Sequence, residues 1–402
     1  MLELQGKYNT AKVFTNNVEP SAIQEIEHLL NQEFIAGSKI RIMPDVHAGM
    51  GSTIGTTMTI TDKVVPNLVG VDIGCGMETV LLKDKRLELS QLDKAIHQYI
   101  PAGFETRQTP HHFNDEIDLT ALRCAKHVSM ERAELSMGTL GGGNHFIELG
   151  KDDTGALYLV VHSGSRNLGK QVCEYYQNKA AQIQIDIPKR QEKELIAKLK
   201  ADGRESDIAD TIKSLKKETD PRKKPDRVLA YLEGTWFDDY LHDIAIVQYY
   251  AELNRKAIVN VLEKKAKLKV EDRFTTIHNY IDIDSMILRK GAISAKKDER
   301  VLIPMNMRDG SLICIGKGNA DWNYSAPHGA GRIMSRITAK KSITLTQYEK
   351  AMKGIYSSTV NRSTIDEAPF AYKPMDEIIA NISDTAKIVK IIKPLYNFKA
   401  AE

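Results

Sequence analysis

The sequence lacks the features that mark membrane, secreted and disulfide-stabilised proteins. No run of apolar residues approaches the roughly 20 that a membrane span requires, and the opening MLELQGKYNTAKVF has no apolar signal-peptide core. The cysteines are scattered without Cys-x-x-Cys pairing, which argues against a disulfide framework and a zinc ribbon. They are Cys75, Cys124, Cys173 and Cys314. We therefore expect a cytoplasmic protein with no membrane association.

A strong charge of one sign is also missing, because 56 Lys and Arg stand against 53 Asp and Glu, for a net charge of +3. Charge alone therefore neither requires nor forbids a nucleic-acid partner, and any phosphate-binding surface must be local. Hydrophobic residues make up 42% of the chain and charged residues 27%, as in ordinary globular proteins. With 402 residues, the chain is long enough to bury a substantial core.

Helix-like and strand-like segments are interleaved irregularly, which predicts an α+β fold rather than a doubly wound sheet. Apolar residues at helical spacing predict helices at 21–30 and 238–262, and strand-like runs are expected at 40–43, 56–60, 63–71, 157–161 and 388–398. Thr346 and Glu349 are expected to form a capping box that opens a helix. The charged segment 182–226 predicts a helical hairpin insertion, either solvated or in contact with a phosphate backbone.

The segment GVDIGCGM, residues 70–77, places the carboxylate of Asp72 and the thiol of Cys75 in a turn rich in glycine. Glycine lets the backbone bend so that both side chains can converge, and this pair of ligands suits a divalent transition metal. Taken alone, an Asp-x-x-Cys sequence is more simply a tight turn with a buried cysteine, since free cysteine packs as a small hydrophobic residue. Its meaning therefore depends on the rest of the chain.

Three histidines occur in similar polar or glycine-rich segments: His145 in GGGNHFIELG, His162 in VVHSGSRNLG and His278 in TIHNYID. Each of them alone is more easily explained as a structural residue. Together with Asp72 and Cys75 they form a set of five metal-type ligands, and a thiolate can bridge two ions. The set predicts a dinuclear centre with Cys75 shared.

Two further loops contain histidine. In the loop predicted at 44–55, Asp45 and His47 are either partners that orient a metal ligand or ordinary turn and surface residues. His111 and His112 are adjacent in a polar loop, so we expect both at the surface.

His328 lies in the segment SAPHGAGR, where glycines and Arg332 follow it. Backbone N–H groups and a guanidinium in such a loop suit an anion, so a phosphate could lie beside the imidazole. A histidine in this position could attack phosphorus and form a phosphoramidate. The alternatives from the residues alone are a sixth metal ligand and a packed core histidine.

The segments MPDVHAGMGSTIG, GVDIGCGM, LGGGNHFIELG, HSGSRNLG, HNY and SAPHGAGR, with a lysine near the C-terminus, resemble the RtcB family of RNA ligases, in this order and over nearly the whole chain. The resemblance implies one compact α+β domain over residues 1–402, with mixed sheets, surrounding helices and the 182–226 insertion. It also implies an enzyme that joins an RNA 3′-phosphate or 2′,3′-cyclic phosphate to a 5′-hydroxyl, using GTP and manganese.

Carried over by position, the resemblance implies that two Mn²⁺ ions are bound by Asp72, Cys75, His145, His162 and His278. It implies that His328 is the nucleophile that takes GMP from GTP. The nucleotide-binding residues that it implies are Asn144, His145, Glu148, His278, Asn279, Pro304, Met305, Asn306, Met307, Ser311, His328, Gly329, Ala330, Gly331 and Lys399. Glu148 would accept from guanine N1 and N2 while Lys399 donates to O6, a pattern that adenine cannot satisfy.

Two other functions compete with the ligase. One is a dinuclear metallophosphoesterase that hydrolyses cyclic or terminal nucleic-acid phosphates without a nucleotide, and the other is a non-catalytic RNA-binding protein. For the ligase we expect RNA as the partner, GTP as cosubstrate, an archease-like activator in some settings, and a monomer. RNA repair and tRNA splicing are both compatible with the sequence.

Overall fold

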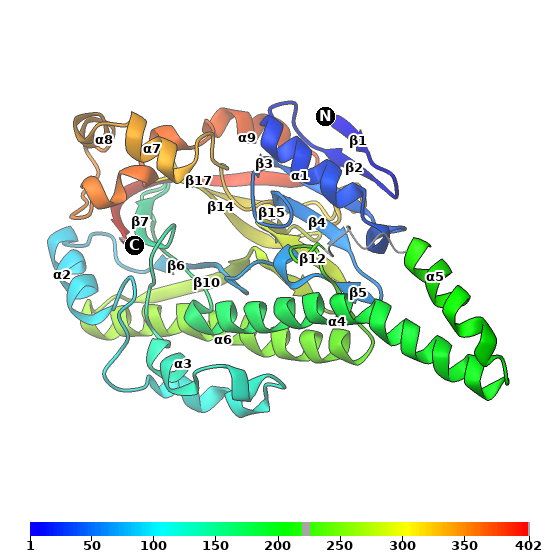
Figure 1. The fold of residues 1–402 in the computed structure, drawn as a ribbon. Helices are drawn as coiled ribbons and strands as arrows, with labels where there is room; N and C mark the ends of the chain where they lie inside the picture. The colour runs from blue at the N-terminus through cyan, green and yellow to red at the C-terminus, as the bar shows by residue number, and fades with distance from the viewer. Residues whose placement is uncertain (219–225, 401–402) are drawn as a thin grey trace.

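Two β-sheets form the centre of the chain in a computed structural model that describes residues 1–218 and 226–400, with the backbone alone at 186–191 and 215–218 (Figure 1). The first sheet has the strand order β1-β2-β3-β4-β12-β11. Only β2 and β3 pair in parallel among these described strands. The strands are β1 (Leu2–Gln5), β2 (Thr10–Val13), β3 (Ile40–His47), β4 (Ile54–Thr59), β11 (Asn279–Asp282) and β12 (Ile287–Lys290).

Strand β3 continues beyond the predicted end at residue 43, through Pro44 and Asp45 to His47. Its register against β4 shifts between Ile42 and His47. Proline cannot donate a ladder hydrogen bond, and a bulge re-aims the side chains that it contains. The irregular part of β3 thus carries Asp45 out of the regular sheet.

The second sheet is antiparallel, with the order β10-β6-β8-β7-β17-β15-β14. Its long strand β17 pairs with both β7 and β15, and the register shifts in both pairings bend it. The strands are β6 (Gly76–Leu82), β7 (Phe146–Lys151), β8 (Leu157–Ser163), β10 (Val270–Ile277), β14 (Arg300–Asn306), β15 (Gly310–Gly316) and β17 (Ala386–Lys399). Two small sheets pair β5 (Lys63–Val64) with β9 (Leu232–Glu233) and β13 (Ala292–Ser294) with β16 (Ser325–Pro327).

Two long helices, α4 (Arg166–Ala201) and α6 (Thr235–Lys265), run side by side along one side of the sheets (Figure 1). In its C-terminal part, α6 packs Ile258 and Leu262 in one core cluster with Leu159 and Val161 of β8. The shorter helices are α1 (Pro20–Leu30), α2 (Leu89–Tyr99), α3 (Met130–Ser136), α5 (Ile208–Glu218), α7 (Arg336–Ser342), α8 (Leu345–Ala351) and α9 (Met375–Asn381). The described 3₁₀ turns are Glu33–Ile35, Pro66–Leu68, His112–Glu116, Leu119–Ala121, Ala125–His127, Glu205–Asp207, Ala320–Trp322, Arg362–Glu367 and Pro369–Ala371.

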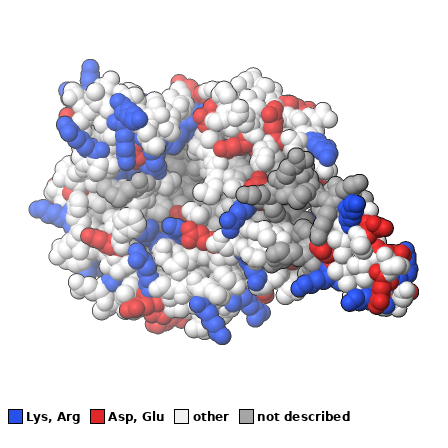
Figure 2. Space-filling model, in the orientation of Figure 1, with Lys and Arg blue, Asp and Glu red and all other residues white. Residues whose placement is uncertain are grey.

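The predicted α+β fold is therefore confirmed, and helices α4 and α5 form the predicted helical hairpin over its described part. Helix α4 begins at Arg166, so the hairpin continues a core helix without a break. Figure 2 shows acidic and basic side chains interspersed on the projecting hairpin. The last residues of the predicted insertion before 226 lie outside the described part of the chain.

Three local predictions were wrong. The strand expected at 63–71 ends at Val64, because Pro66 opens a 3₁₀ turn. The capping box at helix α8 is formed by Thr344 and Gln347, two residues before the predicted pair. His111 is buried rather than exposed, and its ring contacts His112 and Phe113.

None of the helices in the described residues combines the length and the apolar character needed to cross a lipid bilayer.

Candidate functional site

The loop that carries Asp72 and Cys75 lies between a 3₁₀ turn and the start of β6, against helix α6. A Cβ at Gly74 would lie 2.9 Å from Ala251 Cβ, and one at Gly76 would lie 2.3 Å from Thr276 O. Gly74 also has φ 71°, a conformation that disfavours other residues. Both glycines are therefore required for the loop to pack this closely.

The three predicted histidine ligands come from neighbouring strands. His162 lies in β8 and pairs across the sheet with Met77 of β6 and Phe146 of β7. His145 immediately precedes β7, and His278 lies between β10 and β11. Because β6 pairs with both β8 and β10, the register brings the side chains to one edge of the second sheet.

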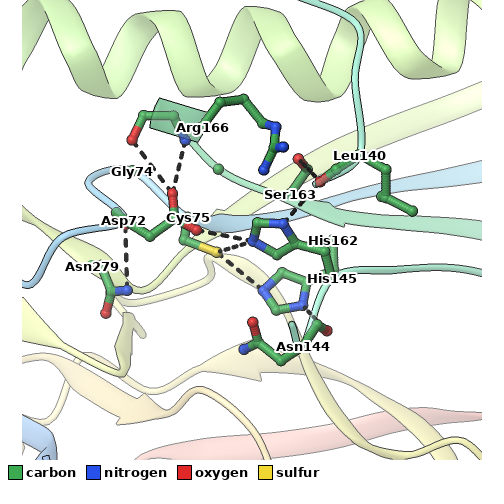
Figure 3. Close-up of polar contacts among 12 residues, drawn as sticks. Asp72, Gly74, Cys75, Leu140, Asn144, His145, His162, Ser163, Arg166 and Asn279 are labelled. Atoms are coloured by element: carbon green, nitrogen blue, oxygen red, sulfur yellow. Dashed lines mark hydrogen bonds and ion pairs between the residues drawn. The ribbon is translucent and has the colours of Figure 1, made fainter. Parts of the chain in front are cut away.

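The five predicted metal ligands converge there. Cys75 Sγ lies 3.2 Å from His162 Nε2 and 3.4 Å from His145 Nε2. His162 Nε2 is 3.4 Å from His278 Nε2, and His145 Nε2 is 2.9 Å from Asp72 Oδ2. Figure 3 shows Cys75, His145 and His162 pointing toward one another. The ligand atoms form two groups, Cys75 with His162 and His278, and Asp72 with Cys75 and His145, so Cys75 belongs to both.

The hydrogen bonds of the histidines show why this arrangement fits metal ions. His145 Nδ1 lies 2.8 Å from Leu140 O and His162 Nδ1 lies 3.2 Å from Asn144 O, so each Nδ1 is a donor to a carbonyl. In the neutral ring each Nε2 then carries a lone pair. The Nε2 lone pair of His145 faces Cys75 Sγ and Asp72 Oδ2, and that of His162 faces Cys75 Sγ and His278 Nε2. Electron pairs this close repel one another unless a proton or a cation lies between them. A carboxylate, a thiolate and imidazoles are ligands suited to divalent transition metals.

Two adjacent residues of α6 hold the backbone segments that carry these ligands. Asn254 Oδ1 accepts from Gly138 N at 2.8 Å, and its Nδ2 donates to Ser163 Oγ at 3.0 Å. Arg255 Nη1 donates to Gly74 O at 2.6 Å and to Ser163 O at 3.1 Å. Both side chains are fully buried. One turn of α6 therefore fixes the loops next to three of the predicted ligands.

His328 is oriented by Asp45, a role that the sequence did not indicate. The buried Asp45 Oδ2 lies 2.6 Å from His328 Nδ1 and accepts from His328 N at 3.0 Å. Asp45 therefore orients His328 and not one of the five predicted metal ligands, which was one of the two predictions for it. The neighbouring His47 is half-buried, and desolvation of its ring lowers its pKa to about 4. The His328 ring lies 4.9 Å from the ring of His278, centroid to centroid, so the imidazole adjoins the ligand cluster.

A cavity of about 490 Å³ adjoins His328 and the inner ligands. Most of the predicted nucleotide-binding residues line it: Asn144, Glu148, His278, Pro304, Met305, Asn306, Met307, His328, Gly329, Ala330, Gly331 and Lys399. The other three are His145, Asn279 and Ser311. Asn279 Oδ1 accepts from Gly291 N at 2.8 Å, and Ser311 is buried next to Glu148.

Glu148 is one of the buried residues that line the cavity. Its Oε2 accepts from Asn397 Nδ2 at 2.8 Å, whereas Oε1 is buried and has no partner among the described residues. Burial raises the pKa of Glu148 to about 7, although Asn397, Lys399 and Ser311 favour the charged form. A buried acceptor without a partner costs free energy, so the cavity is prepared for a ligand that donates hydrogen bonds.

Lys399, which also lines the cavity, is held by Glu367, a residue that the sequence did not indicate. Lys399 Nζ lies 2.7 Å from Glu367 Oε2 and 3.1 Å from Asn144 O, which leaves one of its three N–H bonds for a ligand. Burial opposes ionisation of Glu367, but the charges of Lys399 and Arg336 lower its pKa to about 2. Tyr372 donates to the same carboxylate at 2.6 Å.

Arg332 lines the cavity, but its guanidinium is already engaged. It donates to Asp366 O at 2.7 Å and lies 3.3 Å from Glu367 Oε1. Its predicted contact with phosphate would therefore compete with these acceptors. The sequence did not indicate Glu367, Tyr372 or Asn397, which also line the cavity. None of them belongs to a recognisable motif, and only the folding of distant segments brings them to the cavity.

The chain is similar to known proteins over most of its length. A family model described as tRNA-splicing ligase RtcB matches residues 26–126 and 112–400. The RNA-splicing ligase RtcB of Escherichia coli (strain K12) is 30% identical, over 94% of this chain and 93% of the relative. The tRNA-splicing ligase RtcB of Aeropyrum pernix is 28% identical, over 88% of this chain and 86% of the relative. The tRNA-splicing ligase RtcB of Methanococcus maripaludis is 25% identical, over 87% of this chain and 85% of the relative.

Proposed function

Because the chain belongs to the RtcB family of tRNA-splicing ligases, we propose that it joins RNA 3′-phosphate or 2′,3′-cyclic phosphate ends to 5′-hydroxyl ends, with GTP and two Mn²⁺ ions. The observation that carries this proposal is the position of His328. Its ring is oriented by the buried Asp45 and lies between the cavity and the ligand cluster. A phosphoesterase without a nucleotide would not need a cavity of about 490 Å³ beside such a histidine.

The contact between Asp45 and His328 prepares the imidazole for attack on phosphorus. When the Nδ1–H of the neutral ring donates a hydrogen bond to Asp45 Oδ2, Nε2 carries the lone pair. Nε2 then attacks the α-phosphorus of GTP, a P–N bond forms, the P–O bond to the β-phosphate breaks and pyrophosphate leaves. Asp45 stabilises the positive charge that the ring acquires.

The later steps return the histidine to its first state. A 2′,3′-cyclic phosphate would first be opened by water, whose oxygen bonds to phosphorus as the P–O2′ bond breaks, leaving a 3′-phosphate and a 2′-hydroxyl. An oxygen of the RNA 3′-phosphate then attacks the phosphorus on His328, the P–N bond breaks and GMP is attached to the RNA end. The 5′-hydroxyl oxygen then attacks the 3′-phosphate, and GMP leaves as the new phosphodiester forms. The hydroxyl proton passes to the departing GMP or to solvent.

Asp72, Cys75, His145, His162 and His278 would hold the two ions, with Cys75 shared. When bound, such ions neutralise phosphate charge and orient the reacting groups. In the cavity, the carboxylate of Glu148 would accept from guanine N1 and N2, and the remaining N–H of Lys399 would donate toward O6. Adenine presents the opposite pattern at these positions, so the pocket would select GTP.

The test is a ligation assay with a 3′-phosphate RNA and a 5′-hydroxyl RNA, supplied with Mn²⁺ and either GTP, ATP or no nucleotide. If the protein is a ligase, a joined product should form with GTP but not with ATP or without a nucleotide. Loss of the terminal phosphate without joining, and at the same rate without nucleotide, would favour the metallophosphoesterase. An archease-like activator is included in parallel, because the family resemblance predicts one in some settings.

We also propose that the protein acts in the cytoplasm as a monomer. All four cysteines are buried and free, a state that a reducing compartment maintains. Size-exclusion chromatography with light scattering would measure the oligomeric state.

A further inference from the structure

The loop 101–107 presents a phenylalanine to solvent close to the predicted metal ligands. Phe104 is 84% exposed, the largest exposed fraction among the large hydrophobic residues described. A single exposed hydrophobic residue is common on protein surfaces and carries no function by itself. What sets this residue apart is how firmly its loop is held, and to what.

The loop is hydrogen-bonded to the segment that leads to the first predicted histidine ligand. Gly103 N donates to Gly141 O at 3.0 Å, and Leu140 N donates to Pro101 O at 2.9 Å. Arg166 Nη2 donates to Gly103 O at 2.8 Å. Because the backbone on both sides of the aromatic residue is fixed, its ring is presented without the entropy cost of ordering a mobile loop.

The loop is also close to the metal ligands in space. A Cβ at Gly141 would lie 2.8 Å from His145 Nδ1 and would overlap Arg166. Gly103 bonds to Gly141, and Phe104 is the next residue along the chain. Asp72, which bonds to His145, has a side chain that is 28% exposed. Of the predicted ligands, His162 and His278 line the cavity that holds Glu148, whereas Asp72 and His145 do not, so the exposed side of Asp72 is a separate approach to the cluster.

The charge around this approach is suited to a polyanion. Three arginines lie close to the loop: Arg107 belongs to it, Arg166 donates to Gly103 O, and Arg132 interacts electrostatically with Arg166. Arg166 also interacts with the charge of Asp72. Arg107 lies beside Gly138. The loop itself adds one acid, Glu105. Cations beside an exposed aromatic ring form the usual binding surface for single-stranded nucleic acid.

We propose that Phe104 is a stacking platform for a base of the RNA strand whose end reaches the metal centre. The inference rests on the proposed function, because it takes the RNA end as the substrate of this site. Stacking is tolerant of sequence, since every base has a flat face. The platform would therefore position RNA ends of many sequences, with the arginines acting on the backbone.

The first experiment measures the affinity of wild type, Phe104→Ala and Phe104→Trp for fluorescent single-stranded RNA, by anisotropy. One RNA ends in a 3′-phosphate and the other in a 5′-hydroxyl, which identifies the strand that is stacked. Phe104→Ala should weaken binding of at least one RNA by about 5- to 100-fold, and Phe104→Trp should restore it. Phe370→Ala is the matched control, since Phe370 is 43% exposed beside a different cavity, and it should change nothing.

The second readout is labelling of the protein by GTP without RNA, which Phe104→Ala should leave at the wild-type rate because the residue is outside the nucleotide cavity. Ultraviolet crosslinking of RNA with 5-iodouridine near its end should label Phe104. If wild type is labelled by GTP and binds RNA, but Phe104→Ala binds as tightly, the platform is wrong and the proposed function stands. If wild type neither reacts with GTP nor binds these RNAs, both are wrong.

Discussion

The raised pKa of Glu148 predicts that recognition of guanine depends on pH. Binding requires the charged carboxylate, because guanine N1 and N2 both donate hydrogen bonds. In the free protein burial raises the pKa of Glu148 to about 7, so its charged fraction differs about tenfold between pH 6 and pH 8. The affinity for guanosine should therefore rise about tenfold over this range. Guanosine is the appropriate probe, since it has no phosphate that titrates.

Isothermal calorimetry at pH 6, 7 and 8, in two buffers with different ionisation enthalpies, measures both the affinity and the protons released. At pH 6 the wild type should release close to one proton for each guanosine bound. Glu148→Gln is the control, and it should bind weakly with no dependence on pH and no proton release. A wild-type affinity that is constant from pH 6 to pH 8, without proton release, would contradict the assignment of Glu148 to guanine.

The same shift affects stability, with a sign that is easily tested. A carboxyl whose pKa is higher in the folded protein binds its proton more tightly when folded, so this contribution is present at low pH and is lost as the pH rises from about 4.5 to about 7. The full loss is about 3 kcal/mol. In the absence of ligand, Glu148→Gln should therefore gain stability relative to wild type between pH 5 and pH 8 in urea denaturation.

Four further substitutions test other parts of the site. Asp45→Asn should slow reaction with GTP by about 100-fold or more, measured in single turnover, because the amide cannot stabilise the charged His328 ring; a wild-type rate would contradict this role. Asn254→Ala should weaken Mn²⁺ binding by about 10- to 100-fold, measured by electron paramagnetic resonance, with rescue of GTP labelling at high Mn²⁺; unchanged affinity would contradict it. Cys75→Ala should lose both bound ions, whereas His145→Ala should lose only one, as measured by mass spectrometry. If the two variants lose the same number of ions, Cys75 is not shared between two sites.

Residues that belong to continuous motifs could be found in the sequence. The predicted ligands and His328 are each embedded in a short glycine-rich or polar segment, and the resemblance to the RtcB family, confirmed by the comparisons, names them together. Their convergence follows from strand register. Met77 pairs with His162, and Gly76 pairs with Ile277, which precedes His278.

The residues that orient these groups could not be found in this way. Asp45 is 283 positions from His328, and Glu367 meets Lys399 only because β17 ends beside a 3₁₀ turn. Such contacts depend on the packing of elements that are distant in the chain, and no local pattern records them. Around Pro66 the local pattern was itself misleading. The apolar run there predicts a strand, but the proline opens a 3₁₀ turn instead.

The central claim is that His328 becomes covalently attached to GMP, and one measurement tests it most directly. Wild type and His328→Ala are incubated with Mn²⁺ and GTP labelled at the α-phosphate, with and without an archease-like activator, and then separated on a denaturing gel. The account predicts a protein-bound label that is acid-labile, depends on GTP rather than ATP, and is absent in His328→Ala. No label on a metal-loaded, folded wild type with the activator present would contradict the account, and so would equal labelling of His328→Ala.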